Sequence, residues 1–182
     1  MVVILQNSSV ASYLNTISGQ KEIRMNKNEF IQQYRHTWRV FERLVKDFDA
    51  EAWLQTGRGV ITPARLALHI LLGTQYYLDD KTPFQFPSGK PFEIDWQTIK
   101  TDDLPLQNDI LVFIREMMDK TEEWLLDLEY DAENKSFPWA GETQLGVVIF
   151  LLRHSLFHIG EMSSLLNESK DGLVEDHYVK AL

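Results

Sequence analysis

Four stretches of this chain place apolar residues three and four positions apart, the spacing that lines one face of an α-helix. The first stretch follows Asn26 and Glu29, which are spaced as the capping box that begins many helices. The second follows Thr62 and Pro63, a capping residue with proline at the first helical position. The pattern predicts an all-α protein whose long helices cover about residues 27–49, 63–80, 103–128 and 143–168.

The segments between the predicted helices indicate how the helices connect. Glycines at positions 57 and 59 break the chain before the second helix, and residues 134–141 form a loop before the fourth. A longer connection over about residues 81–104 contains three prolines, and connections of this length are uncommon unless they cross a domain or line a site. Four helices with one long crossover between the second and the third predict a four-helix bundle.

The length of 182 residues suits a single domain that covers residues 1–182 and has one core. We place that core at about residues 27–168. Residues 1–25 show no sustained periodicity, and residues 169–182 follow the last predicted helix. Both ends are therefore interpreted as extensions of the bundle.

Composition and charge narrow the classes of function. The formal net charge is −9, with no basic stripe to offset it, so the chain is expected to repel nucleic acid. It has no cysteine, so any metal must be held by histidine, carboxylate or water. No basic segment opens a signal peptide, and the uncharged apolar stretch of residues 143–152 is too short to span a bilayer. These features predict a cytoplasmic protein that does not enter a membrane.

Three of the five histidines lie in apolar helical stretches. His154 and His158 are four residues apart, which on a helix brings their Cβ atoms to roughly 5–6 Å and lets both imidazoles reach one ion. His69 lies in the second predicted helix. A lone histidine on such a face is more often a core residue than a ligand, but three without an ion would be difficult to satisfy with hydrogen bonds. We interpret the three as a mononuclear metal site.

Competing metal motifs do not fit the sequence. The Glu-x-x-His motif of di-iron bundles is absent, and so is the His-Glu-x-x-His motif of zinc proteases. Glu161, one turn after His158, is a candidate catalytic residue with three roles open: a fourth ligand, an acceptor that orients an imidazole, or a base. A solvent-exposed glutamate is the alternative. Gly160, which is costly inside a helix, suggests a close helix approach.

Several other residues are weaker candidates. His36 and His177 are flanked by charge and are not expected to be ligands. Arg65 and Tyr76 fall on the same predicted helix as His69. Arg65 either holds an anion or forms a salt bridge at the rim of the site. Tyr76 either lines the pocket or is a core residue. Trp139 either walls the pocket or anchors its loop.

The combination of His69 with the motif His154-x-x-x-His158-x-Gly160-Glu161 resembles the DinB/YfiT-like family of metalloenzymes. The resemblance covers about residues 27–168. It implies an up-down-down-up bundle, a divalent metal on the three histidines, and frequent dimerisation. Relatives in that family include thiol-dependent S-transferases and maleylpyruvate isomerase. The last motif position is often glutamine, so Glu161 departs from the family pattern.

Two functions follow from these expectations. In the first, the metal activates a low-molecular-weight thiol or water for transfer to an electrophilic small molecule, as in an S-transferase or a hydrolase. In the second, the chain is a non-catalytic metal-binding or stress-associated dimer. Zinc or nickel is the expected ion, ahead of iron or manganese, because nitrogen sites follow the Irving–Williams order and copper is scarce in cells.

We also expect a homodimer from the aromatic surface of the first predicted helix. That surface is larger than one seam of a bundle needs, and burying the remainder at about 25 cal/mol per Å² would favour association. The residues that carry it are Phe30, Tyr34, Trp38, Phe41 and Phe48.

Overall fold

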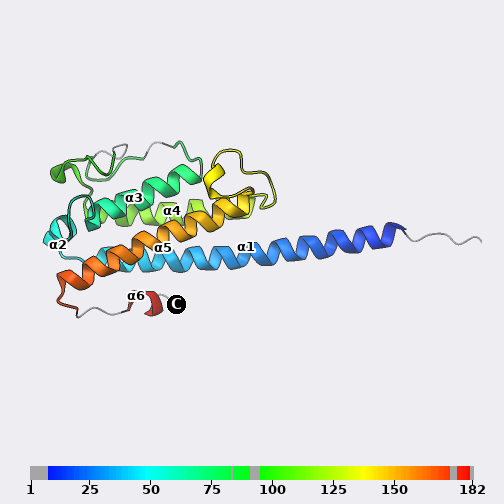
Figure 1. Ribbon diagram of the computed structural model, residues 1–182, viewed down its shortest axis with the longest axis horizontal. Coiled ribbons are helices and arrows are strands. Elements are labelled where there is room, and N and C mark those ends of the chain that lie inside the picture. The colour runs from blue at the N-terminus through cyan, green and yellow to red at the C-terminus, as the bar shows by residue number, and fades with distance from the viewer. Residues whose placement is uncertain (1–7, 83, 91–94, 173–175, 181–182) are drawn as a thin grey trace, which may run out of the picture.

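The computed structural model describes residues 8–82, 84–90, 95–172 and 176–180, and this part of the chain is all-helical, without a β-strand (Figure 1). The prediction of an all-α protein is confirmed. The elements are α1 (Ser8–Asp47), α2 (Ala50–Gln55), α3 (Pro63–Tyr77), η1 (Thr101–Asp103), α4 (Gln107–Asp127), η2 (Pro138–Ala140), α5 (Gln144–Ser169) and α6 (His177–Lys180).

The longest helix, α1, begins 18 residues earlier than the sequence pattern predicts, at Ser8 instead of Asn26. The capping box at Asn26 and Glu29 is therefore wrong as a helix start, because both residues lie inside a continuous helix. No proline falls between residues 8 and 26, so nothing local stops the helix there. Figure 1 shows this part of α1 extending past the other helices.

Four of the five aromatic side chains on which the dimer prediction rests are buried inside the monomer, and the fifth packs against its core. Tyr34, Trp38, Phe41 and Phe48 are all at most 3% exposed, and Phe30 packs edge-on against Tyr130. The reason given for a homodimer, leftover aromatic surface on this helix, is therefore wrong. A homodimer stays a prediction that rests on the family resemblance alone.

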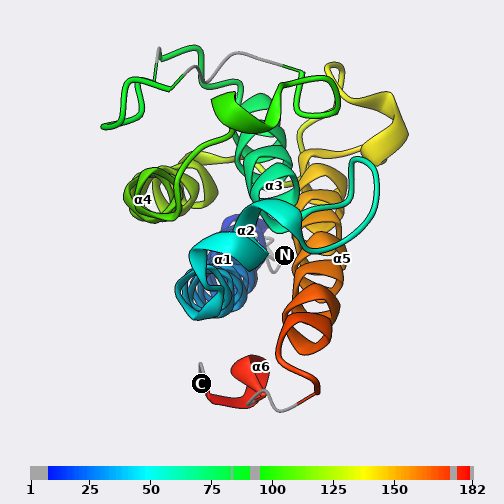
Figure 2. The same cartoon turned by 90° about the vertical axis from the view of Figure 1, so that its left-hand side faces the viewer.

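Four helices contact one another in a closed sequence: α1 and α3 each pack against both α4 and α5 (Figure 2). The buried apolar side chains of these helices form one core. A hydrogen bond also ties α1 to α5, because the buried hydroxyl of Tyr34 donates to the carbonyl of Val148 over 2.7 Å. The pairing of α3 with α5 brings His69 beside the other two histidines.

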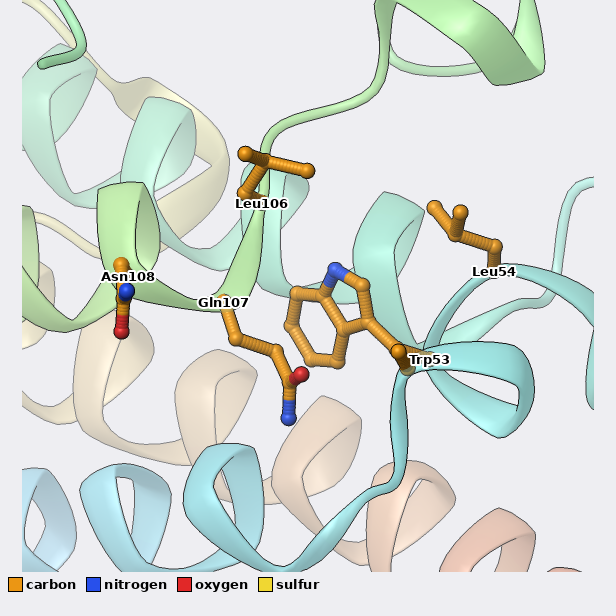
Figure 3. A pocket seen from close by; sticks show the side chains of 6 residues that line it. Trp53, Leu54, Leu106, Gln107 and Asn108 are labelled. Atoms are coloured by element: carbon orange, nitrogen blue, oxygen red, sulfur yellow. The ribbon is translucent and has the colours of Figure 1, made fainter. Parts of the chain in front are cut away.

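A short helix that the sequence pattern missed, α2, follows α1 and packs against α3. Asp49 caps α2 by accepting from Ala52 N, so it begins this helix instead of ending the first one. Trp53 donates its indole N–H to the carbonyl of Pro105. Gln107 donates to two carbonyls at the end of α1. A surface pocket of about 200 Å³ opens beside these side chains, without a histidine in its lining (Figure 3).

The predicted start of the third long helix, Asp103, lies in the short helix η1, and α4 begins at Gln107. The start of α4 is fixed by the carboxylate of Asp109, which accepts from Leu106 N and from Ser88 N. Asp109 therefore caps α4 and fixes the crossover at the same point. The crossover carries no α-helix in its described residues.

The boundaries of α3 and α5 follow the sequence pattern closely at their starts. Thr62 and Thr143 occupy the N-cap positions, although neither side chain makes a capping hydrogen bond. The end of α3 comes at Tyr77, before the predicted Asp80, because Asp79 takes a left-handed conformation with φ of 52°. By length and composition α5 could cross a membrane, but core helices of proteins outside membranes pass the same test, and α5 packs against α1 and α3.

The chain segment after α5 returns to α1. In α6, His177 Nε2 lies 2.7 Å from Asp47 Oδ2, and the His36 Nε2 atom lies 2.7 Å from the carbonyl oxygen of Tyr178. Both remaining histidines therefore attach α6 to α1, as expected for residues outside the metal site.

Candidate metal centre

The three predicted ligands come together where α3 packs against α5. His69 projects from α3, and His154 and His158 project from successive turns of α5. One ring nitrogen from each lies within 4.8 Å of the other two, and His69 Nε2 lies 3.1 Å from His154 Nε2. The histidine cluster, as we call these three residues, can hold a metal ion.

The three imidazole rings are steeply inclined to one another. Their centroids are 4.6–4.9 Å apart in every pair, and the interplanar angles are 73–84°. The lone pair of an imidazole nitrogen lies in the ring plane, so stacked rings would point their lone pairs in parallel directions. Inclined rings can instead direct three lone pairs at one point.

The spacing of the nitrogens fits a small divalent ion. Two imidazole nitrogens bound to one tetrahedral zinc ion at about 2.0–2.1 Å lie about 3.4 Å apart, close to the 3.1 Å between His69 and His154. A different nitrogen of the same ring, His154 Nδ1, is buried and has no partner among the described residues, and an ion bound at Nε2 would leave it so.

Glu161 contacts the cluster through one nitrogen. Its Oε2 atom lies 2.7 Å from His158 Nδ1, which leaves Nε2 of that ring to face the other histidines. A carboxylate on the outer nitrogen fixes the tautomer and the orientation of a metal-binding imidazole. Of the three roles open to Glu161, this geometry matches the orienting acceptor.

The electrostatic environment keeps two of the histidines neutral. Burial, with the neighbouring charges of His158 and His154, lowers the pKa of His69 from 6.5 to about 4. Burial and His158 lower the pKa of His154 from 6.5 to about 4 in the same way. Both lone pairs are therefore available for a cation at neutral pH, since ligating imidazoles must be deprotonated.

The same shifts predict how the metal-free protein responds to acid. The unfolded chain holds these histidines near pKa 6.5, so between pH 6.5 and 4 it binds more protons than the folded chain. We expect thermal stability, measured by circular dichroism after chelation, to fall as pH drops through this window. The double variant H69Q/H154Q should show a shallower fall, and an equally steep fall in that variant would contradict the assignment.

Gly73, a residue the sequence pattern did not single out, allows α3 to approach His154. A Cβ atom at this position would lie 3.1 Å from His154 Cε1, which is tighter than most contacts of a real Cβ. The close approach had been expected at Gly160 instead. That expectation is wrong, because Gly160 is exposed and a Cβ there would meet nothing within 4 Å.

The two glycines give a matched pair of variants. Gly73→Ala should displace the His154 ring and lower metal affinity about tenfold, the smaller end of the loss seen when ligand orientation is disturbed. Gly160→Ala should leave affinity unchanged and raise stability by about 0.5–1 kcal/mol, since alanine favours the helix. Calorimetric titration with zinc and thermal melts of both variants test this. Equal affinities in the two variants would contradict a positioning role for Gly73.

Other predicted site residues have different roles in the structure. Among the described residues, Arg65 donates to the carbonyls of Trp96, Gln97 and Ile99 and so fastens the crossover to α3. Tyr76 is exposed instead of being a core residue, and Trp139 is anchored by donating to the hydroxyl of Tyr77.

The crossover contributes a residue that sequence reasoning missed. The Trp96 ring packs on His69, with centroids 4.4 Å apart and an interplanar angle of 33°. Arg65, one turn before His69, holds the Trp96 carbonyl and keeps this ring in place. This contact places the crossover, of which Trp96 is part, beside the histidine cluster.

The cluster is not enclosed in the core. Each of the three histidines is partly exposed, whereas neighbouring residues on the core face, such as Ser155 and Ile159, are at most 4% exposed. An ion held here could therefore be reached by a small molecule. No protein-family model, curated protein or solved structure matches this chain.

Proposed function

We propose that this chain is a metal-dependent enzyme that transfers a low-molecular-weight thiol, or water, to an electrophilic small molecule. His69, His154 and His158 would hold the ion. A divalent ion on three nitrogens supplies Lewis acidity, lowering the pKa of a thiol or water that occupies its open position. Zinc or nickel suits three imidazoles best.

The residues around the ligands support this proposal. Glu161 fixes the His158 ring by accepting at Nδ1, so a ligand nitrogen is oriented before any ion or substrate arrives. The lowered pKa of His69 and His154 keeps their lone pairs free at neutral pH. Trp96 packs on one side of the His69 ring and so holds it in position.

The partial exposure of all three histidines is the observation that favours catalysis over a purely structural metal. A structural site is normally closed by four protein ligands, whereas a catalytic site keeps a position for substrate. The histidine cluster offers three protein ligands and lies at a surface, which matches the second arrangement.

The proposal also covers the topology of the helices, the cellular location and the oligomeric state. We infer that α1, α3, α4 and α5 form a DinB-like four-helix bundle of up-down-down-up order, with the crossover between α3 and α4. The contacts of α1 and α3 with both α4 and α5 support this order. A cytoplasmic location and a homodimer complete the proposal, on the sequence features and the family resemblance.

A transfer assay with Glu161→Gln tests the proposed function. Zinc- or nickel-loaded protein should accelerate the reaction of a panel of low-molecular-weight thiols with a chlorodinitrobenzene, and chelation should abolish the acceleration. Glu161→Gln should bind metal about 10–100-fold more weakly, because the amide orients His158 less well. Glu168→Gln, an exposed position further along α5, is the matched control and should behave as wild type. Full metal loading without transfer to any electrophile would favour the non-catalytic function.

A further inference from the structure

Five aromatic side chains form an aromatic platform beside the histidine cluster. They come from the end of α3, from the loop around η2 and from the first half of α5, which lie side by side in Figures 1 and 2. Successive ring centroids are 4.9–5.9 Å apart, so the contacts are continuous. The members are Tyr76, Tyr77, Phe137, Trp139 and Phe150.

Two members of the aromatic platform expose much of their side chains to solvent. Tyr76 and Trp139 are each 57% exposed. Trp139 is held in place because its indole N–H donates to the Tyr77 hydroxyl over 2.9 Å, and Tyr76 packs edge-on against Phe137. Large aromatic side chains that are exposed and fixed offer stacking surface to a ligand at low entropic cost.

A positively charged side chain, that of Arg153, lies at the edge of the aromatic platform. The guanidinium carbon of Arg153 lies 5.5 Å from the centroid of the Phe150 ring, and this is the contact the structure gives it. Among the described residues Arg153 forms no ion pair, although the chain carries nine more acidic than basic residues. Its N–H groups are therefore available to a carboxylate, which a guanidinium binds in a bidentate manner.

Phe150 connects the platform to the histidine cluster. Its ring lies parallel to that of His154, at an angle of 10° and a centroid distance of 6.2 Å. The Phe150 ring also contacts the ring of Tyr77, and the guanidinium of Arg153 lies over it. Phe150 therefore connects the Arg153 end of the platform to the ring of a predicted metal ligand.

We propose that Arg153 and the aromatic platform bind a small aromatic carboxylate, and that the electrophile the site accepts carries such a group beside its reactive carbon. This inference rests on the proposed function for its catalytic meaning, but the binding itself needs no metal. The ring of the ligand stacks on the exposed side chains of the platform, and its carboxylate pairs with Arg153. A neutral aliphatic molecule finds neither interaction.

Binding of 2-naphthoate, followed by NMR titration of the full chain with and without zinc, tests this inference. Arg153→Gln should weaken 2-naphthoate about tenfold and leave the neutral 2-naphthamide unchanged, because only the charged ligand uses the guanidinium. Trp139→Ala should weaken both ligands by a similar factor, since both stack. Arg39→Gln, which removes an exposed arginine from α1, is the control for net charge and should have no effect.

The outcomes separate this inference from the proposed function. Arg153-dependent binding of 2-naphthoate to the metal-free chain supports the inference even if the protein fails to retain zinc. Equal loss of both ligands in Arg153→Gln, or binding unaffected by Trp139→Ala and Tyr76→Ala, would overturn it. A zinc-loaded chain that does not bind 2-naphthoate would overturn it while leaving the metal centre intact.

Discussion

Replacing any one residue of the histidine cluster with glutamine should remove most of the bound metal. Each variant takes away one of three nitrogens, and the remaining two cannot hold a divalent ion as firmly. The affinity should fall by more than the roughly 10–100-fold that follows when only an orienting residue is lost. Zinc affinity of His69→Gln, His154→Gln and His158→Gln, measured by competition with a chromogenic chelator, gives the result.

A matched control is available within the same chain. His36→Gln removes an imidazole that contacts the Tyr178 carbonyl, outside the cluster, and should leave zinc affinity unchanged. The folded state should survive in the cluster variants, because their side chains are only partly buried. Wild-type affinity in any of the three cluster variants would show that the corresponding residue is not a ligand.

Truncating Phe113 should cause the largest loss of stability. Its side chain is fully buried in α4, stacks on Phe84 at 3.8 Å between centroids and meets Phe86 edge-on, so it joins the crossover to the core. Phe113→Ala should cost about 3–5 kcal/mol, the usual range when a buried phenylalanine leaves a cavity. Urea denaturation measures the free energy of unfolding directly.

The neighbouring Val112 supplies the comparison for that variant. It is 44% exposed, so Val112→Ala should change the free energy of unfolding by no more than about 0.5 kcal/mol. A loss below 1 kcal/mol for Phe113→Ala would mean that the crossover is not packed against α4 as described.

The predictable part of the fold is the part determined by residues close in sequence. Thr62 with Pro63, and Thr143, mark the starts of α3 and α5 because they stand directly before strongly apolar helices. The start of α1 could not be predicted in this way, since Asn26 and Glu29 also fit the interior of a longer helix. The start of α4 depends on Asp109, whose carboxylate also accepts from Ser88 of the crossover, a contact between residues distant in sequence.

The candidate metal site also has a part that the sequence pattern predicts and a part that depends on how the helices pack. The spacing of His154 and His158 indicates a shared helical face, and the structure brings His69, the third predicted ligand, beside them from α3. The supporting residues depend on how helices pack, which the pattern along one chain does not contain. Gly73 and Gly160 illustrate this: both interrupt apolar helices, but a side chain would meet His154 only at the first. Trp96 has no motif at all and reaches His69 through the crossover.

Metal content of the untagged chain tests the central claim most directly. The protein is incubated with excess zinc, freed of unbound ion by gel filtration, and analysed by mass spectrometry of the element. The histidine cluster predicts about one equivalent of zinc per chain, and close to none in the triple variant H69Q/H154Q/H158Q. Zinc retained equally by the wild-type chain and the triple variant, or by neither, would contradict a metal centre at these three residues.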